Sequence, residues 1–194
     1  MQIDHTRPCI LIDFGATNSR LIAVADGVVQ HHHMLQFGGD LLDRSIYYGL
    51  LKKFGLHISQ TQARKLKHKL GAATPRSLVK CTHASMQLEG LAVNRNVHSL
   101  ITIDSESVNE IFQPVMAALS KSLSQAFSTI PPYMKDAAYD TGIQLCGGGA
   151  LLSRMEQLVM EATDWPVEMA SSPLTCAVRG ANKQFKTTIA AEAA

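Results

Sequence analysis

Residues 9–36 read CILIDFGATNSRLIAVADGVVQHHHMLQ, and this stretch decides the fold. Residues 9–14 are almost continuously apolar, which is typical of a buried strand. A second apolar run at 20–25 is followed by Asp26-Gly27, a strong hairpin signal, and then by a third run at 28–36. The sequence therefore predicts a meander of three strands, with the third antiparallel to the second.

After the meander, the spacing of the apolar residues becomes that of a helix. Apolar residues at every fourth position across 42–54 predict a helix that Asp40 caps. Ser59 opens an S-x-x-Q capping box for a second helix, which Gly71 ends. Two helices are therefore expected directly after the three strands.

The rest of the chain contains a weakly patterned stretch and then alternating strands and helices. Short alternating pieces at 78–82, 86–91 and 97–103 predict a few strands. Asp104 or Ser105 caps a long helix that Pro114 is expected to kink or split. The strands and helices predicted after it are a strand at 142–146, a helix at 150–162, a strand at 167–170 and a last helix with Pro173 at its first position.

This order of elements predicts an α/β fold. A three-strand meander continued by strand–helix units is the layout of the ribonuclease-H-like core, which actin, Hsp70 and the sugar kinases each contain twice. We expect one such lobe only. We assign residues 8–71 and 104–185 to this actin/Hsp70-type lobe, 72–103 to a small α+β insertion and 186–194 to a tail.

The composition describes a globular chain of 194 residues, of which 46% are hydrophobic. Lys plus Arg number 18 and Asp plus Glu 16, and a net charge of +2 gives no reason to expect a nucleic-acid partner. No apolar run approaches the roughly 18 residues that span a bilayer, and no secretory signal or membrane-binding segment is visible. The four cysteines form no CxxC pair, so we expect a cytoplasmic protein without a zinc site.

The turn between the first two strands is a candidate phosphate site. Gly15 allows a close backbone approach, and the amides and hydroxyls of Thr17, Asn18 and Ser19 are donors that phosphate oxygens accept. Asp13 is suited to hold a hydrated Mg²⁺, which prefers one or two carboxylates together with phosphates and waters. The alternative is a plain hairpin turn, because the same residue types favour turns.

A second candidate is Gly147-Gly148-Gly149, which runs from a strand into a helix that begins with Ala150. This geometry accepts anions and nucleotides. The alternative is a tight strand–helix connection, and the loop is not a P-loop because no Gly-Lys-Ser/Thr follows.

Two further clusters carry less chemistry. At most two of His31-His32-His33 share a face of a strand, and no flanking acid or cysteine completes a metal site. The basic run from Arg64 to Lys69 is typical of a solvated helix face, with a ligand contact by Lys67 as the alternative.

Taken together, these segments resemble the second half of the bacterial actin MreB family, over about Ile10–Lys183. Six segments carry the resemblance. Residues 12–19 resemble the family's second phosphate loop, and GGDLLD at 38–43 resembles its GGD-x-x-D helix start. ARKLKHKLG at 63–71 resembles its nucleotide-contacting helix, usually AERIKHEIG, and SPLTCAVRG at 172–180 resembles its DPLTCVARG segment. Pro131-Pro132 and GGGALL at 147–152 match its PPE and GGGALL stretches. The resemblance implies a fold of two lobes that face each other across an ATP cleft, of which this chain covers the second.

The resemblance also implies a site for ATP and Mg. The residues that it assigns to nucleotide binding are Asp13, Gly15, Thr17, Asn18 and Ser19 in the turn, Arg64 and Lys67 in the helix, and Gly147, Gly148, Gly149 and Ala150 in the glycine loop. Several positions depart from the family pattern. Two glycines of the turn have become Ala16 and Thr17, its last acid has become Arg20, and a helix Glu has become Arg64, which has no acceptor for a ribose hydroxyl. We therefore expect weak or vestigial binding of ATP and Mg.

The function that the resemblance implies is that of an MreB-like cytoskeletal, cell-shape protein, truncated or half of a split pair. We expect it to act through filament or partner contacts, with its own copies or another actin-like chain. The isolated chain is expected to lack ATPase activity. A lobe built to face a partner is also expected to expose apolar surface around Phe14, Leu145 and Leu151.

Two alternatives stay open. An ATPase whose cleft is completed by another chain or by self-association would clamp phosphate from both sides. A ribonuclease-H-like nuclease would use Asp13, but a two-metal site needs several converging acids, and Asp40 and Asp43 are better explained as helix caps.

Overall fold

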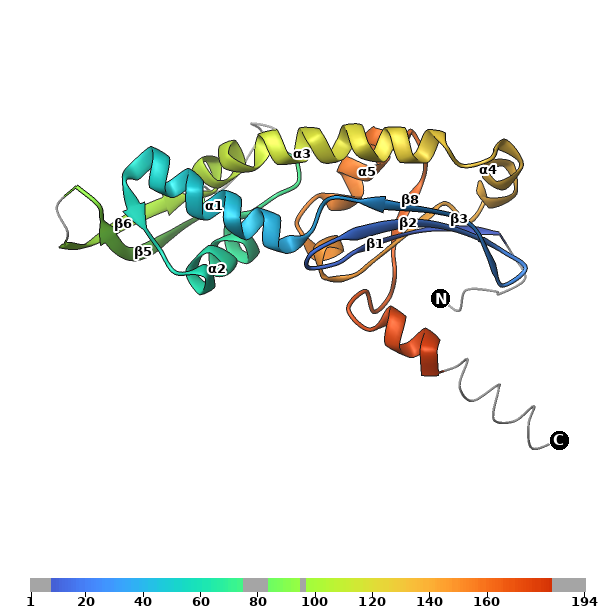
Figure 1. Ribbon diagram of the computed structural model, residues 1–194, viewed down its shortest axis with the longest axis horizontal. Coiled ribbons are helices and arrows are strands. Elements are labelled where there is room, and N and C mark those ends of the chain that lie inside the picture. Colours follow the sequence, from blue (N-terminus) through green and yellow to red (C-terminus); the bar gives the residue numbers. More distant parts are fainter. Residues whose placement is uncertain (1–7, 75–83, 95–96, 183–194) are drawn as a thin grey trace.

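The computed structural model describes residues 8–74, 84–94 and 97–182, and it places two sheets in an elongated molecule (Figure 1). The larger sheet has the strand order β3-β2-β1-β7-β8, and the smaller has the order β4-β5-β6. The strands are β1 (Cys9–Phe14), β2 (Ser19–Ala25), β3 (Val28–Leu35), β4 (Leu56–His57), β5 (Ser85–Ala92), β6 (Val97–Asp104), β7 (Ile143–Cys146) and β8 (Val167–Met169). The helices are α1 (Gly39–Phe54), α2 (Gln60–Leu70), α3 (Ser105–Ser128), α4 (Pro132–Ala138), the 3-10 helix η1 (Gly148–Leu151) and α5 (Met155–Thr163).

The predicted three-strand meander is confirmed. β1 pairs antiparallel with β2, and β2 pairs antiparallel with β3. Asp26 and Gly27 have φ angles of 53° and 72°, as the two central residues of a type I′ hairpin turn require. β7 and β8 extend the sheet beyond β1 as parallel strands. A meander continued by parallel strand–helix units is the predicted ribonuclease-H-like topology.

Helices α3 and α5 cover one face of the larger sheet (Figure 1), and the hydrophobic core lies between these helices and the sheet. The strand residues that point to this face are fully buried: Ile10, Ile12, Phe14, Leu21, Ala23, Ile143 and Leu145. The expectation of exposed surface at Phe14 and Leu145 is therefore wrong, because the strand register places both side chains under the helices. Leu151 on η1 does have 52% of its surface exposed.

The first helices differ from the prediction in how they begin and continue. Gly38 is the N-cap of α1, so Asp40 lies inside the first turn and does not cap the helix. Ser59 and Gln62 form the predicted capping box of α2. Helix α3 is capped by Asp104 and is not split by Pro114. Pro114 lies on the exposed side of α3, where solvent can reach the carbonyl that loses its helical hydrogen-bond partner.

The segment after β7 departs further from the prediction. The helix predicted at 150–162 is divided, because η1 ends at Leu151 and α5 begins only at Met155. Arg154 between them has a φ of 64°, a left-handed conformation that interrupts a helix. The last helix begins at residue 176 instead of Pro173, and residues 176–182 project from the side of the sheet opposite α3 (Figure 1).

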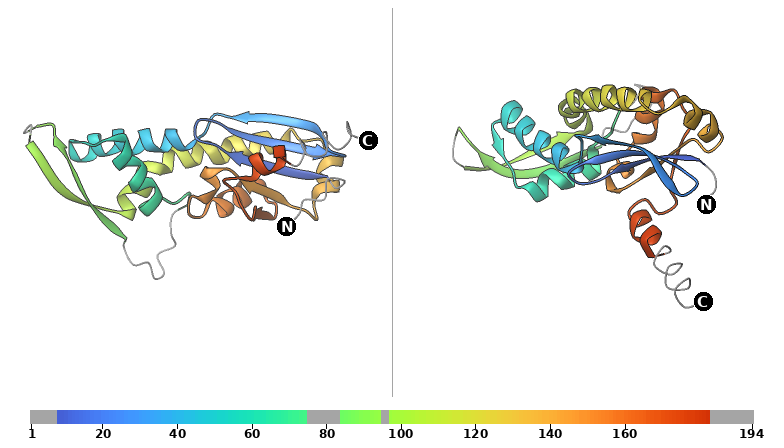
Figure 2. Two further views of the ribbon diagram at one scale, coloured as in Figure 1. Left: turned by 90° about the horizontal axis from the view of Figure 1, so that it is seen from below. Right: turned by 45° about the vertical axis from the view of Figure 1, so that its right-hand side comes forward.

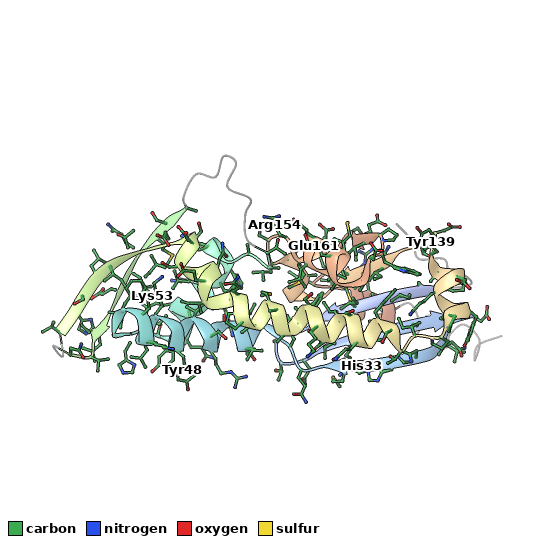
Figure 3. All side chains as sticks on the ribbon, turned by 90° about the horizontal axis from the view of Figure 1, so that it is seen from above. His33, Tyr48, Lys53, Tyr139, Arg154 and Glu161 are labelled. Carbon is green, nitrogen blue, oxygen red and sulfur yellow. The ribbon has the colours of Figure 1, made fainter. Side chains whose placement is uncertain are left out.

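The smaller sheet lies at one end of the molecule (Figure 2). β5 and β6 form a hairpin that confirms the strands predicted near 86–91 and 97–103, whereas the piece predicted at 78–82 lies outside the described residues. Lys53 at the end of α1 pairs with Glu110 of α3 at 2.5 Å, which joins this end to the long helix (Figure 3). The division of the chain into the lobe, the insertion and the tail stays a prediction.

Candidate functional site

A cavity of about 720 Å³ opens between the end of the larger sheet and helix α2. Five of the predicted site residues line it: Gly15, Arg64, Lys67, Gly148 and Gly149. The other six, which are Asp13, Thr17, Asn18, Ser19, Gly147 and Ala150, lie in the same segments but do not line it. The three segments that the sequence singled out therefore meet at one cavity.

The turn between β1 and β2 rests on the start of α1. The amides of Gly39 and Asp40 donate to the carbonyls of Gly15 and Ala16 at 3.1 and 2.8 Å. A Cβ at Gly38 would overlap the Ala16 carbonyl, so a glycine is needed for this close packing. The first amides of α1 are therefore committed to the turn and do not face the cavity as free donors.

The polar side chains of the turn have different surroundings. Ser19 is fully buried, and its hydroxyl donates to the Phe37 carbonyl at 2.8 Å. Thr17 and Asn18 are exposed, and Asp13 is half-buried at the end of β1. Ser19 thus holds the strand pair to the segment before α1, which is a structural role.

The thiol of Cys146 on β7 lies beside Asp13. Burial, the negative charge of Asp13, the nearby Cys176 and a hydrogen bond with Asp13 raise the pKa of Cys146 to about 12. A carboxylate next to a neutral thiol offers one possible metal ligand. Among the described residues, no group of three or more His, Cys, Asp or Glu side chains is arranged to hold a metal ion.

A side chain at each of the three glycines of the loop would meet different surroundings. Gly147 has a φ of 82°, and a Cβ there would overlap the Phe14 carbonyl and lie 2.5 Å from Asp13 Oδ1. A Cβ at Gly149 would lie 2.8 Å from Phe14 Cβ, whereas one at Gly148 would meet only Leu174, at 3.4 Å. The loop is glycine-rich chiefly because it packs against the end of β1.

The start of η1 supplies backbone donors to the cavity. Gly148 and Gly149 are its first two residues, whose amides have no intrahelical acceptor. In the part of the chain that the structure describes, no backbone carbonyl accepts from either amide. Ala150 is different, because it is buried and its amide donates to Gly147 O at 3.3 Å.

Helix α2 contributes two cations that meet a buried acid on α1. Lys67 Nζ lies 2.8 Å from Asp43 Oδ1, and Arg64 Nε lies 3.2 Å from Asp43 Oδ2. Arg64 also approaches Asp40 at 3.5 Å. The prediction of Asp43 as a helix cap is wrong, since Asp43 lies in the second turn with its side chain towards α2. The burial of Asp43 could have been found from the sequence, because Asp43 follows the apolar Leu42 on the face that α1 buries.

Comparison with known proteins relates the chain to the MreB/Mbl family. The family model described as MreB/Mbl protein matches residues 1–192. The cell shape-determining protein MreB of Escherichia coli K12 is 28% identical over 186 residues, which are 96% of this chain and 52% of that protein. The cell shape-determining protein Mbl of Bacillus subtilis is 24% identical over 180 residues, or 93% of this chain and 53% of that protein. The chain thus spans about half the length of the curated relatives it matches.

Solved structures show the same fold. The crystal structure of MreB5 of Spiroplasma citri bound to AMPPNP has a TM-score of 0.87 and 21% identity, and it covers 98% of this chain and 56% of its own. A MamK double helical filament has a TM-score of 0.71 and 18% identity, covering 92% of this chain and 54% of its own. The described part of the chain contains no helix with the length and apolar character that a membrane crossing requires.

Proposed function

The chain belongs to the MreB/Mbl family, and on that premise we propose that it is an actin-like cytoskeletal lobe. Its relatives are cell shape-determining proteins, and a MamK relative in fold forms a double helical filament. We place this chain in the cytoplasm, where it acts on cell shape through contacts with its own copies or with another actin-like chain. The observation that carries the proposal is the match of residues 1–192 to the MreB/Mbl family, together with a cavity at which the turn, the glycine loop and α2 meet.

The cavity is proposed to bind an adenine nucleotide. Its volume of about 720 Å³ lies within the range of small-molecule sites. The amides of Gly148 and Gly149 and the ammonium group of Lys67 are suited to phosphate oxygens. Relatives in fold were solved with AMPPNP and with ADP.

Binding is proposed to be weak. The Ser19 hydroxyl is committed to Phe37, and Arg64 is engaged with two acids. Asp13 is one carboxylate, which suits Mg²⁺ only where nucleotide phosphates and water complete the coordination. A bound Mg²⁺ would neutralise phosphate charge there, and Asp13 is the residue of the turn that would hold it.

Completion of the cavity by a second chain is the other candidate function, namely an ATPase assembled from two chains. Two apolar side chains that line the cavity face solvent: Leu151 is 52% exposed and Leu174 is 68% exposed. Val178, in the segment after Leu174, is 71% exposed. Exposed apolar residues grouped at one place favour an interface. A partner seated on them would wall the open side of the cavity.

Sedimentation velocity over a wide concentration series tests the proposed contacts. We expect reversible self-association that Leu174→Ser and Val178→Ser weaken, because these residues contribute apolar area without supporting the core. A strictly monomeric chain at every concentration would contradict self-association. Phosphate release from ATP that rises with chain concentration would favour the assembled ATPase over the lobe without turnover.

A further inference from the structure

Asp43 on α1 is a buried carboxylate beside the cavity. Its side chain has no exposed surface, and Lys67 and Arg64 of α2 are the charged groups that the described residues bring within 4 Å of it. A buried carboxylate is tolerated only where cations and hydrogen bonds compensate for its lost hydration. Asp43 therefore needs these two α2 side chains, and it holds them to α1 in return.

Lys67 and Arg64 both line the cavity, and Lys67 is the less exposed of these two partners of Asp43. Its side chain is 11% exposed, and Nζ donates to Gly39 O at 3.0 Å while it lies 2.8 Å from Asp43 Oδ1. An ammonium group has three N–H donors. Within the described ranges, the Gly39 carbonyl accepts a hydrogen bond from Nζ, whereas Asp43 Oδ1 is its ion-pair partner and accepts no hydrogen bond. N–H donors of Lys67 are therefore left for a group inside the cavity, which this residue lines.

The contact with Gly39 places this ammonium group next to the turn. The Gly39 amide donates to Gly15 O at 3.1 Å, which joins the start of α1 to the turn. A Cβ built on Gly39 would lie 3.1 Å from Lys67 Nζ and 4.0 Å from Ala16 Cα. The cation is therefore fixed on the side of the cavity where the phosphate groups of a nucleotide are proposed to lie.

We propose that Asp43 is a positioning residue for Lys67. Its buried carboxylate holds the ammonium group against Gly39, so that a remaining N–H donates to an anionic phosphate oxygen of a nucleoside diphosphate or triphosphate. Because the cation is already ordered, little conformational freedom is lost when the ligand binds. Arg64, which also lines the cavity, compensates the charge of Asp43 from the more exposed side. This inference rests on the proposed nucleotide site.

An NMR titration with ADP on lysine-labelled chain tests the role. The Nζ signal of Lys67, assigned with Lys67→Met, is expected to be visible without ligand, since a buried ion-paired ammonium exchanges its protons slowly, and to shift when ADP is added. Asp43→Asn keeps the shape and removes the charge. It should lose the signal and weaken ADP binding about tenfold, the effect of one charge-assisted hydrogen bond. The double variant should bind ADP as Lys67→Met does, because the two residues act through one group.

Two variants serve as matched controls. Glu110→Gln removes the acid of the Lys53 ion pair, which lies outside the cavity, and Lys65→Met removes an exposed cation from α2. Both are expected to retain the parent affinity for ADP. If Asp43→Asn does not fold, the Lys67 signal in the parent chain and the affinity of Lys67→Met decide the question.

The outcomes separate this role from the proposed site. ADP binding by the parent chain with an unmoved Lys67 signal, or with unchanged affinity in folded Asp43→Asn or Lys67→Met, overturns the positioning role and leaves the nucleotide site standing. No ADP binding by the parent chain overturns the nucleotide site, and the positioning role with it.

Discussion

The turn at 15–18 and the glycine loop at 147–149 reach the same cavity from neighbouring strands, yet different contacts hold them in place. In the turn, the carbonyls accept from α1, and the adjacent Ser19 hydroxyl is tied to Phe37. In the glycine loop, Gly147 and Gly149 pack closely against Phe14 at the end of β1. Hydrogen bonds to α1 and to Phe37 therefore fix the turn, whereas close backbone packing fixes the glycine loop.

The largest effect is expected from Gly147→Ala. The left-handed φ of 82° and the overlap with the Phe14 carbonyl act together, so we expect a loss of about 3 kcal/mol in the free energy of unfolding. Gly148→Ala is the matched control and should change it by less than about 0.5 kcal/mol, because its Cβ meets only Leu174. Urea denaturation of both variants measures the difference. Equal stability of the two variants would show that neither the left-handed backbone nor the close contact with Phe14 requires a glycine at position 147.

Ser19→Ala tests the turn in the same way. It leaves the buried Phe37 carbonyl without its donor and should cost about 1–2 kcal/mol, with no change in ADP affinity. Thr17→Ala, on the exposed part of the turn, is the control for stability. A variant of Ser19 that is as stable as the parent but binds ADP more weakly would make Ser19 a ligand contact.

Cys146, next to Gly147 at the end of β7, gives a pH-dependent test of the junction between the two regions. Burial above all, and then the Asp13 charge, raise its pKa from 9.0 to about 12, so the folded state favours the neutral thiol. The unfolded chain loses this proton first, and stability should therefore be full below pH 9 and fall as the pH rises from 9 towards 12. Cys146→Ala should lessen this fall in denaturation curves taken across that range. An unchanged slope would mean that the thiol does not contribute.

The smallest effect is expected from returning glycines to the turn. Ala16→Gly with Thr17→Gly removes two side chains and should improve ADP affinity about threefold, at a cost of about 1 kcal/mol in stability from the added chain entropy. The same NMR titration measures it. Weaker binding in this variant would show that these side chains assist the ligand.

The sequence predicted what local signals determine. Asp26-Gly27 set the hairpin, and Ser59 with Gln62 set the start of α2, because turns and caps depend on a few adjacent residues. Pro114 was misjudged because its cost depends on which side of α3 faces water. The division between η1 and α5 was missed because the left-handed residue between them is Arg154. A glycine at that position would have indicated a left-handed conformation, whereas an arginine does not.

The site was predicted in part for the same reason. Gly15, Lys67, Gly148 and Gly149 were found from local patterns and do line the cavity. The burial of Ser19 and the pairing of Asp43 with α2 depend on contacts between residues 18 to 24 positions apart. Such contacts are set by the packing of α1 against the turn and α2, which no short window of sequence contains.

Calorimetric titration of the isolated chain with MgADP tests most directly whether this lobe keeps the actin-like fold while its nucleotide site is weakened. We expect a dissociation constant well above the micromolar range, with the remaining affinity lost in Lys67→Met. A low-micromolar or tighter constant for the parent chain would show instead that the cavity is a fully functional nucleotide site.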